Sequence, residues 1–267
     1  MSTDESIGHA EEVPQPNSKP SKLLVLTLVV ALASAGMSGY AISKATSNKP
    51  SESLATSVKD GDLFLAPVDL AGFIGTVEQS VVEIACYGTG TGFAYDLEVE
   101  DSEFKTVVVT NYHVVSDCLD DPSAMEIYTY AQYETPAKYR VRGVDEENDV
   151  VLLEIVEELP ILYGSKVFAE RGWWTMVIGN PVDATSENEE DWRTLFNATT
   201  FGQISYVLDD YFNYTSATIN GGNSGGPLLN SRGEVIGINT QAGASTEGGV
   251  WNVAFDMSIL CKKLFSC

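Results

Sequence analysis

Short segments rich in valine, isoleucine, threonine and aromatic residues constrain the fold of this chain more than any other feature. Turn-forming residues separate these segments about every ten positions, a spacing that predicts an all-β sandwich or barrel. A short amphipathic helix over 68–77 and a terminal helix over 257–265 are expected on either side of them. The expected strands are 81–86, 92–95, 106–110, 138–144 and 150–156 in the first half and 174–178, 200–207, 227–229, 235–239 and 249–255 in the second.

The N-terminal region contains a long uncharged segment, from Leu23 to Ser43. About 20 helical residues cross a bilayer core, so this segment predicts a single transmembrane signal anchor over 23–43. Ala33-Ser34-Ala35 has the small residues of a signal-peptide cleavage site, which makes secretion after cleavage the alternative. We expect a disordered cytoplasmic tail over 1–22, a linker over 44–66 and a folded extracytoplasmic domain over 67–267.

The chain is strongly acidic, with 38 acidic and 15 basic residues among 267 and a formal net charge of −23. Such a surface repels phosphate backbones, so we expect no nucleic-acid partner. Apolar residues make up 44% of the chain, which argues for a folded body rather than a disordered one. The oligomeric state stays open.

All four cysteines follow the apolar segment: Cys86, Cys118, Cys261 and Cys267. An even number in an exported domain is consistent with two disulfides, for which three pairings are possible. Four buried thiols are the alternative.

The segment Gly221–Pro227 reads GGNSGGP and places one hydroxyl, that of Ser224, between paired glycines. Glycines let the backbone turn sharply and bring its N–H groups close to an incoming carbonyl. A glycine-rich hairpin is the alternative. A serine presented in this way predicts a nucleophile, which then needs a histidine as base and an acid to orient it.

Candidates for both partners lie upstream of this serine. His113 is the only histidine after the apolar segment, so it is the one imidazole available as general base. Asp149 opens the apolar run Val150–Leu153, which predicts a carboxylate at the edge of a buried strand, whereas Asp145 and Glu147 stand in a polar stretch expected to face solvent.

The chain resembles the trypsin-like serine proteases of the HtrA (high-temperature requirement) type. The phrases that carry the resemblance cover about 68–264: Thr110–Val115 (TNYHVV), Asn148–Leu153 (NDVVLL), Val177–Pro181 (VIGNP), Ala217–Leu228 (ATINGGNSGGPL) and Gly233–Thr240 (GEVIGINT). Members of this type usually carry a PDZ domain after the protease, and the chain ends soon after the last expected strand. Peptide-sensing activation and cage assembly are therefore not carried over.

The resemblance implies two six-stranded β-barrels, about 67–160 and 161–267, with the active site between them. It also implies an oxyanion hole formed by Gly222, Asn223 and Ser224, with Thr218 near the base of the primary specificity pocket. Because Thr218 is neutral, we expect cleavage after a small or medium aliphatic residue rather than after lysine or arginine. Asn239, Thr240 and Gln241 are expected to bind substrate backbone as an added strand. Related proteases often join the regions of Cys86 and Cys118, which favours that disulfide and leaves Cys261–Cys267 as the second.

Together these features predict a membrane-tethered serine endopeptidase that acts on extracytoplasmic proteins or peptides through His113, Asp149 and Ser224. No cofactor or metal is expected, because the chain has neither an HExxH helix nor a P-loop. The glycines of Gly88–Gly92 lie between expected strands and predict a hairpin. A non-catalytic or latent peptide-binding module with the protease fold is the alternative function.

Overall fold

A computed structural model of the protein describes residues 62–183, 193–208, 212–244 and 250–257. The chain divides into two compact units, 1–58 and 59–267, and the described residues belong to the second. The proposed transmembrane segment, Cys261, Cys267 and most of the expected terminal helix lie outside the described residues. Among the helices that are described, none is both long enough and apolar enough to cross a bilayer.

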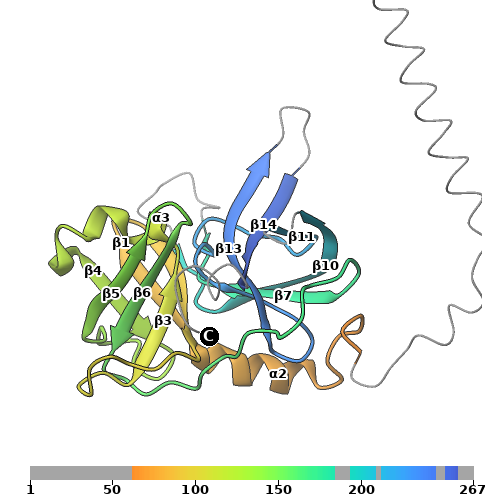
Figure 1. The fold of residues 1–267 in the computed structure, drawn as a ribbon. Coiled ribbons are helices and arrows are strands. Elements are labelled where there is room, and N and C mark those ends of the chain that lie inside the picture. Colours follow the sequence, from red (N-terminus) through yellow and green to blue (C-terminus); the bar gives the residue numbers. More distant parts are fainter. Residues whose placement is uncertain (1–61, 184–192, 209–211, 245–249, 258–267) are drawn as a thin grey trace, which may run out of the picture. The chain divides into compact units, whose positions relative to one another are not determined.

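The first half of the described chain folds into a six-stranded antiparallel sheet in the order β4-β1-β2-β3-β6-β5 (Figure 1). Its strands are β1 (Val81–Cys86), β2 (Thr89–Tyr95), β3 (Thr106–Thr110), β4 (Met125–Thr129), β5 (Tyr139–Asp145) and β6 (Val150–Ile155). The expectation of a closed first barrel is met only in part. The outer strands β4 and β5 are not paired, although the amide of Ala137 donates to the carbonyl of Ile127 at 2.7 Å. The preceding residue, Pro136, has no amide hydrogen with which to extend that ladder.

The second half forms a closed barrel in the order β10-β11-β14-β13-β12-β7, as the resemblance implied. Its strands are β7 (Trp174–Gly179), β10 (Ala198–Leu208), β11 (Phe212–Thr215), β12 (Pro227–Leu229), β13 (Val235–Ala244) and β14 (Val250–Asp256). A separate two-stranded hairpin, β8 (Val182–Asp183) with β9 (Arg193–Thr194), follows β7.

The helices are short. α2 (Leu70–Val77) confirms the expected amphipathic helix, and the side chain of Asp69 caps it by accepting a hydrogen bond from the amide of Gly72. α3 (Tyr112–Val115) follows β3 and carries His113. Three 3-10 turns are η1 (Glu78–Ser80), η2 (Ser116–Cys118) and η3 (Pro122–Ala124).

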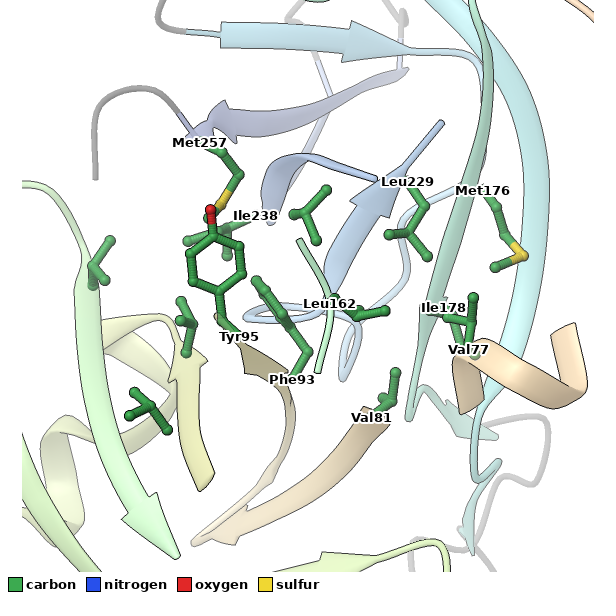
Figure 2. Packing of buried hydrophobic residues seen from close by; sticks show 14 of the residues in the cluster. Val77, Val81, Phe93, Tyr95, Leu162, Met176, Ile178, Leu229, Ile238 and Met257 are labelled. Carbon is green, nitrogen blue, oxygen red and sulfur yellow. The ribbon is translucent and has the colours of Figure 1, made fainter. Parts of the chain in front are cut away.

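One apolar cluster joins the two halves (Figure 2). Phe93 and Tyr95 of β2 meet Ile178 of β7 and Ile238 of β13, and Leu70, Phe73 and Ile74 of α2 pack against the same cluster. Phe93 and Ile238 are fully buried. Burying a side chain of this size contributes about 1.5–3 kcal/mol to stability. The cluster therefore holds together the two halves of the fold that carry the candidate site residues.

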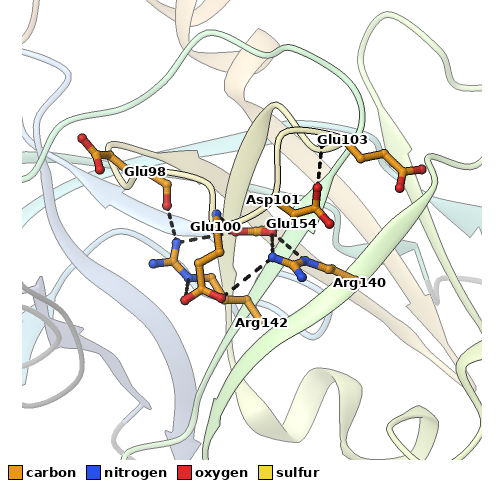
Figure 3. Close-up of polar contacts among 7 residues, drawn as sticks. All are labelled: Glu98, Glu100, Asp101, Glu103, Arg140, Arg142 and Glu154. Carbon is orange, nitrogen blue, oxygen red and sulfur yellow. Dashed lines mark hydrogen bonds and ion pairs between the residues drawn. The ribbon is translucent and has the colours of Figure 1, made fainter.

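A buried ionic network closes the far end of β6 (Figure 3). Glu154 is 0% exposed, accepts the amide hydrogen of Glu100 at 2.7 Å and accepts from Arg140 Nε at 2.7 Å. Arg142 lies between Glu100 and Glu154 and donates to the carbonyl oxygen of Glu98 at 2.7 Å. Every charge in this network faces an opposite charge, which is the condition under which a buried carboxylate is tolerated.

The structure contains the disulfide Cys86–Cys118, the pairing that the resemblance favoured. Its Cα atoms are 5.9 Å apart, and it ties the end of β1 to η2, the turn directly after the His113 helix. The predicted hairpin over Gly88–Gly92 is confirmed as the β1–β2 connection.

Candidate active site

The side chain of Asp149 receives two hydrogen bonds at His113. The backbone amide of His113 donates to Oδ1 at 2.9 Å, and its ring atom Nδ1 lies 2.8 Å from Oδ2. The backbone bond fixes the carboxylate relative to α3, and the ring bond orients the imidazole. The structure therefore brings together this predicted pair, 36 residues apart in sequence.

The turn between β5 and β6 places Asp149. The side chain of Asp145 holds this turn by accepting from the amide and the side chain of Asn148 at 3.0 and 2.6 Å. Asp149 itself has a positive φ of 53°, a conformation that aspartate tolerates better than most residues. Its carbonyl oxygen accepts from the side-chain amide of Asn111 at 2.8 Å, and Asn111 is fully buried before α3.

The environment of Asp149 keeps its carboxylate charged. Burial by itself raises the pKa of this group, but the hydrogen bonds from His113 and Thr240 and the nearby imidazole outweigh it and lower the pKa below the ordinary value. The side chain of Asp149 is 22% exposed and that of His113 is 46% exposed. An anion thus orients an imidazole that remains exposed, and the charged form of Asp149 stabilises the fold until the pH falls through its lowered pKa.

The loop before β12 carries Ser224 and depends on glycine at two positions. Gly222 has a φ of +97°, and a Cβ there would lie 2.3 Å from the carbonyl oxygen of Asn180. Gly225 has a φ of +84°, and a Cβ there would lie 2.2 Å from the carbonyl oxygen of Thr91. Any side chain at either position would push the loop away from β2 and β7, so the two glycines fix where Ser224 is held.

Hydrogen bonds across the two halves anchor the same loop. The amide of Thr91 donates to the carbonyl of Ser224 at 2.9 Å, and its hydroxyl donates to the carbonyl of Gly222 at 2.6 Å. The amide of Asn223 donates to the carbonyl of Asn220 at 3.0 Å. Within the described part of the chain, the amides of Gly222 and Ser224 donate no hydrogen bond. These two donors are the ones available to an incoming oxygen.

Thr240 on β13 links the serine to the His113–Asp149 pair. Its hydroxyl donates to Oδ2 of Asp149 at 2.9 Å, and its carbonyl oxygen lies 3.4 Å from the hydroxyl oxygen of Ser224. The hydroxyl of Ser224 thus faces Thr240, and no hydrogen bond joins Ser224 to His113 among the described residues. Sequence reasoning gave Thr240 a role in binding substrate. One signal in the sequence could have indicated the contact with Asp149. Thr240 is the hydroxyl-bearing residue of the phrase GINT, and on a strand its side chain points to the face opposite that of Asn239, which is buried in the barrel.

The other predicted site residues differ in their surroundings. Asn239 is fully buried, and both its backbone groups bond to Gly225 and Gly226, so it supports the serine loop instead of facing a substrate. Thr218 is exposed, and its carbonyl accepts from the hydroxyl of Thr200 at 2.6 Å. The backbone of Gln241 pairs with Val253 in β14. Among the residues that the structure describes, no group of three or more histidine, cysteine or acidic side chains is arranged to hold a metal ion.

Comparisons with known proteins agree with this geometry. A family model for a trypsin-like peptidase domain matches residues 90–238, which include His113, Asp149 and Ser224. A probable periplasmic serine endoprotease, DegP-like, from Chlamydia trachomatis is 35% identical over 176 residues, covering 65% of this chain and 32% of that protein. A putative serine protease, HhoB, from Synechocystis is 33% identical over 174 residues, covering 60% of this chain and 36% of that protein.

A crystal structure of a serine endoprotease from Yersinia pestis has the same fold, with a TM-score of 0.57 and 24% identity over 74% of this chain and 66% of that one. The chain spans about a third of the length of the curated relatives named above. On the strength of the matched family model, which covers more than half of the sequence, this chain belongs to the trypsin-like peptidase family.

Proposed function

We propose that this chain is a serine endopeptidase in which Ser224 is the nucleophile, His113 the general base and Asp149 the residue that orients the imidazole. The observation that carries the proposal is the two-point bond between His113 and Asp149, linked through Thr240 to a serine in a glycine-lined loop. An unassisted hydroxyl is a weak nucleophile at neutral pH, and a neighbouring imidazole is the usual means of activating it.

In the proposed reaction, the hydroxyl of Ser224 turns from the carbonyl of Thr240 toward His113 and attacks the scissile carbonyl. His113 accepts the serine proton and then donates it to the leaving amine, which leaves an acyl group on Ser224. Water, deprotonated by His113, releases that acyl group. Asp149 stays ionised throughout, in keeping with its lowered pKa, and holds Nδ1 protonated so that Nε2 is free to act as base.

The amides of Gly222 and Ser224 form the proposed oxyanion hole. Losing one such donor typically costs about 2.7–4 kcal/mol of transition-state stabilisation. Asn223, which lies between them in sequence, is 1% exposed and positions the loop from within.

The free edge of β13 is the proposed site for substrate residues that precede the scissile bond. β12 pairs with β13 only from Val235 to Ile238, so the backbone from Thr240 onward is paired on its β14 side alone among the described residues. An extended peptide can add itself to such an edge. Thr218 remains the proposed base of the primary specificity pocket, with the preference for an aliphatic residue that its neutral side chain suggests.

We further propose that the substrates are proteins or peptides outside the cytoplasm. The similar protein from Chlamydia trachomatis is named as periplasmic, and the disulfide Cys86–Cys118 suits an oxidising compartment. The uncharged segment 23–43 is the proposed membrane anchor.

The function is tested with residues 44–267, by casein hydrolysis and by labelling with a fluorophosphonate probe. The unaltered protein should do both, whereas the Ser224→Ala variant should do neither. Ser102→Ala, at an exposed serine of the first half, is the matched control and should behave like the unaltered protein. Persistent labelling of the Ser224→Ala variant would mean that another residue is the nucleophile.

The contact between Ser224 and the Thr240 carbonyl favours a latent form as the second candidate. A latent or non-catalytic module would bind peptides without turning them over. Peptide binding by the unaltered protein, with neither hydrolysis nor probe labelling, would support that alternative.

A further inference from the structure

Beside the serine loop, the described surface carries a cluster of aromatic rings and carboxylates. We call it the aromatic–acidic patch. Tyr133 packs edge-on against Phe196 with ring centroids 4.8 Å apart, and Tyr130 stacks on Phe196 at 6.4 Å. Tyr130 is 48% exposed and Tyr133 is 49% exposed, so their rings present open faces. The patch consists of Tyr128, Tyr130, Tyr133, Phe196, Glu78 and Glu126.

Each tyrosine hydroxyl in the patch is bonded to a carboxylate. Tyr128 donates to Oε2 of Glu126 at 2.7 Å, which raises the pKa of Tyr128 to about 12. A hydrogen bond to Glu78 raises the pKa of Tyr130. These bonds hold the rings in place and gather negative charge at their edges.

Glu83 lies beneath the patch and is left with unused hydrogen-bonding capacity. It is 6% exposed, and burial raises its pKa despite hydrogen bonds from Thr194 and Tyr133. Its atom Oε2 is buried without a hydrogen-bond partner among the described residues. A buried acceptor in this state is costly, and because Oε2 is closed to solvent, Glu83 supports the patch from below and does not itself contact a ligand.

The patch adjoins the serine loop through the hairpin β8–β9. The amide of Val182 donates to the carbonyl of Gly221 at 3.2 Å, and Val182 is paired with Thr194. The hydroxyl of Thr194 lies 3.3 Å from that of Thr89 at the start of β2. Phe196 follows two residues later, fixed by the bond from the amide of Asn197 to the side chain of Asn180 at 3.0 Å.

The direction of a bound substrate follows from these contacts. Ser224 faces Thr240 of β13 on one flank, and Thr91 of β2 bonds its loop on the other. If substrate residues before the scissile bond lie along β13, those after it leave over the start of β2 and the β8–β9 hairpin. Each extended residue advances about 3.3 Å, so the substrate position that meets the patch is found by scanning along the peptide.

We propose that the aromatic–acidic patch binds a lysine or arginine side chain in the part of the substrate that follows the scissile bond. This inference rests on the proposed peptidase function and names a feature of its substrates. The open rings supply cation–π contacts, and Glu78 and Glu126 supply carboxylate oxygens beyond those that the tyrosines use. A neutral apolar side chain would gain only the ring contacts.

The test uses quenched fluorescent peptides built on a bond that the protein cleaves in casein. One residue after that bond is arginine, citrulline, glutamate or phenylalanine, and its place is scanned from the second to the eighth position. We expect kcat/KM for arginine to exceed that for citrulline by about five- to thirtyfold at the best position, mainly through KM. Salt should reduce the difference.

Paired variants assign that preference to the patch. The double variant Glu78→Gln/Glu126→Gln should lose most of the preference for arginine over citrulline and keep only what the ring contacts supply, about two- to fivefold. Glu170→Gln, an exposed glutamate on the second half of the chain, should keep the preference. A p-nitroanilide substrate has no residues after the scissile bond. The unaltered protein, the double variant and Glu170→Gln should therefore hydrolyse it equally.

The outcomes separate this proposal from the proposed function. Cleavage without a preference for arginine, or with a preference for phenylalanine over arginine, would overturn the cationic subsite and leave the peptidase intact. If no peptide is cleaved, the peptidase proposal fails, and the same peptides are then measured for binding to the Ser224→Ala protein. Tighter binding of arginine than citrulline would still support the patch, and equal binding would overturn it.

Discussion

The two ends of β6 hold carboxylates that are bonded alike and exposed differently. Asp149 immediately before the strand and Glu154 near its end each accept a backbone amide hydrogen and face a basic side chain. Glu154 is 0% exposed and faces two arginines, which stay charged at any ordinary pH. Asp149 is 22% exposed and faces a half-exposed histidine, whose imidazole can both accept and donate a proton.

This difference separates a pair that supports the fold from a pair suited to catalysis. A permanently charged partner in a closed site holds strands together but has no proton to exchange. A half-exposed imidazole can pass a proton, provided that its ring is held in one orientation. Asp149 holds the ring of His113 in this way, whereas the basic partners of Glu154 are arginines, which have no proton to exchange.

The largest expected effect is on activity at the Asp149 end. Asp149→Asn should lower kcat by about 10³–10⁴-fold, because the amide would favour the wrong imidazole tautomer. The melting temperature should fall by no more than a few degrees, because the stabilising charge of Asp149 is lost while most of its hydrogen bonds can be kept. Steady-state hydrolysis and thermal unfolding measure the two quantities. Glu147→Gln, in the same turn and exposed, should leave kcat within about twofold. A similar loss in both variants would contradict the role given to Asp149.

The next effect is on stability at the Glu154 end. Glu154→Gln should lower the free energy of unfolding by about 1–3 kcal/mol, because the buried side chain loses its charge-assisted hydrogen bonds while Arg140 stays partly open to solvent. The kcat measured well below the melting temperature should persist. Urea denaturation supplies the free energy, and Glu98→Gln, which removes an exposed carboxylate nearby, should change it by no more than about 0.5 kcal/mol. A Glu154→Gln protein that is stable but inactive would contradict the assignment of Glu154 to stability and of Asp149 to activity.

A smaller effect is expected at Thr240, which bonds the carboxylate from the second half. Thr240→Val should lower kcat by about tenfold, since one hydrogen bond to a charged group contributes about 1.5–3 kcal/mol at most. Thr240→Ser keeps the hydroxyl and should recover most of the activity. The pH profile distinguishes positioning from packing. Losing this bond should raise the pKa of Asp149 and move the acid limb of kcat to higher pH, whereas a packing defect should lower kcat equally at all pH values.

Much of this arrangement could be predicted from the sequence because local patterns encode it. The strands β1, β3 and β12 were predicted with their observed bounds, since each is a run of apolar or β-branched residues between turns. The strand β4 was not predicted, although Met125, Ile127 and Thr129 alternate with more exposed residues. The strand β11 was also missed, because its short run Phe212–Thr215 lies in a polar stretch.

The contacts between the two halves could not be predicted in the same way. That Thr240 bonds Asp149, or that Asn239 turns inward to hold the serine loop, depends on how two sheets pack, and no local pattern reports this. The transmembrane anchor and the pairing Cys261–Cys267 stay predictions, since both lie outside the described residues.

The most direct test asks whether His113 and Ser224 act as one unit, although they come from different halves of the fold. Hydrolysis is compared for His113→Ala, Ser224→Ala and the double variant. Residues that act together in one step give non-additive losses. We predict that the double variant is no slower than Ser224→Ala alone. Losses that multiply in the double variant would contradict the account, because each residue would then contribute independently of the other.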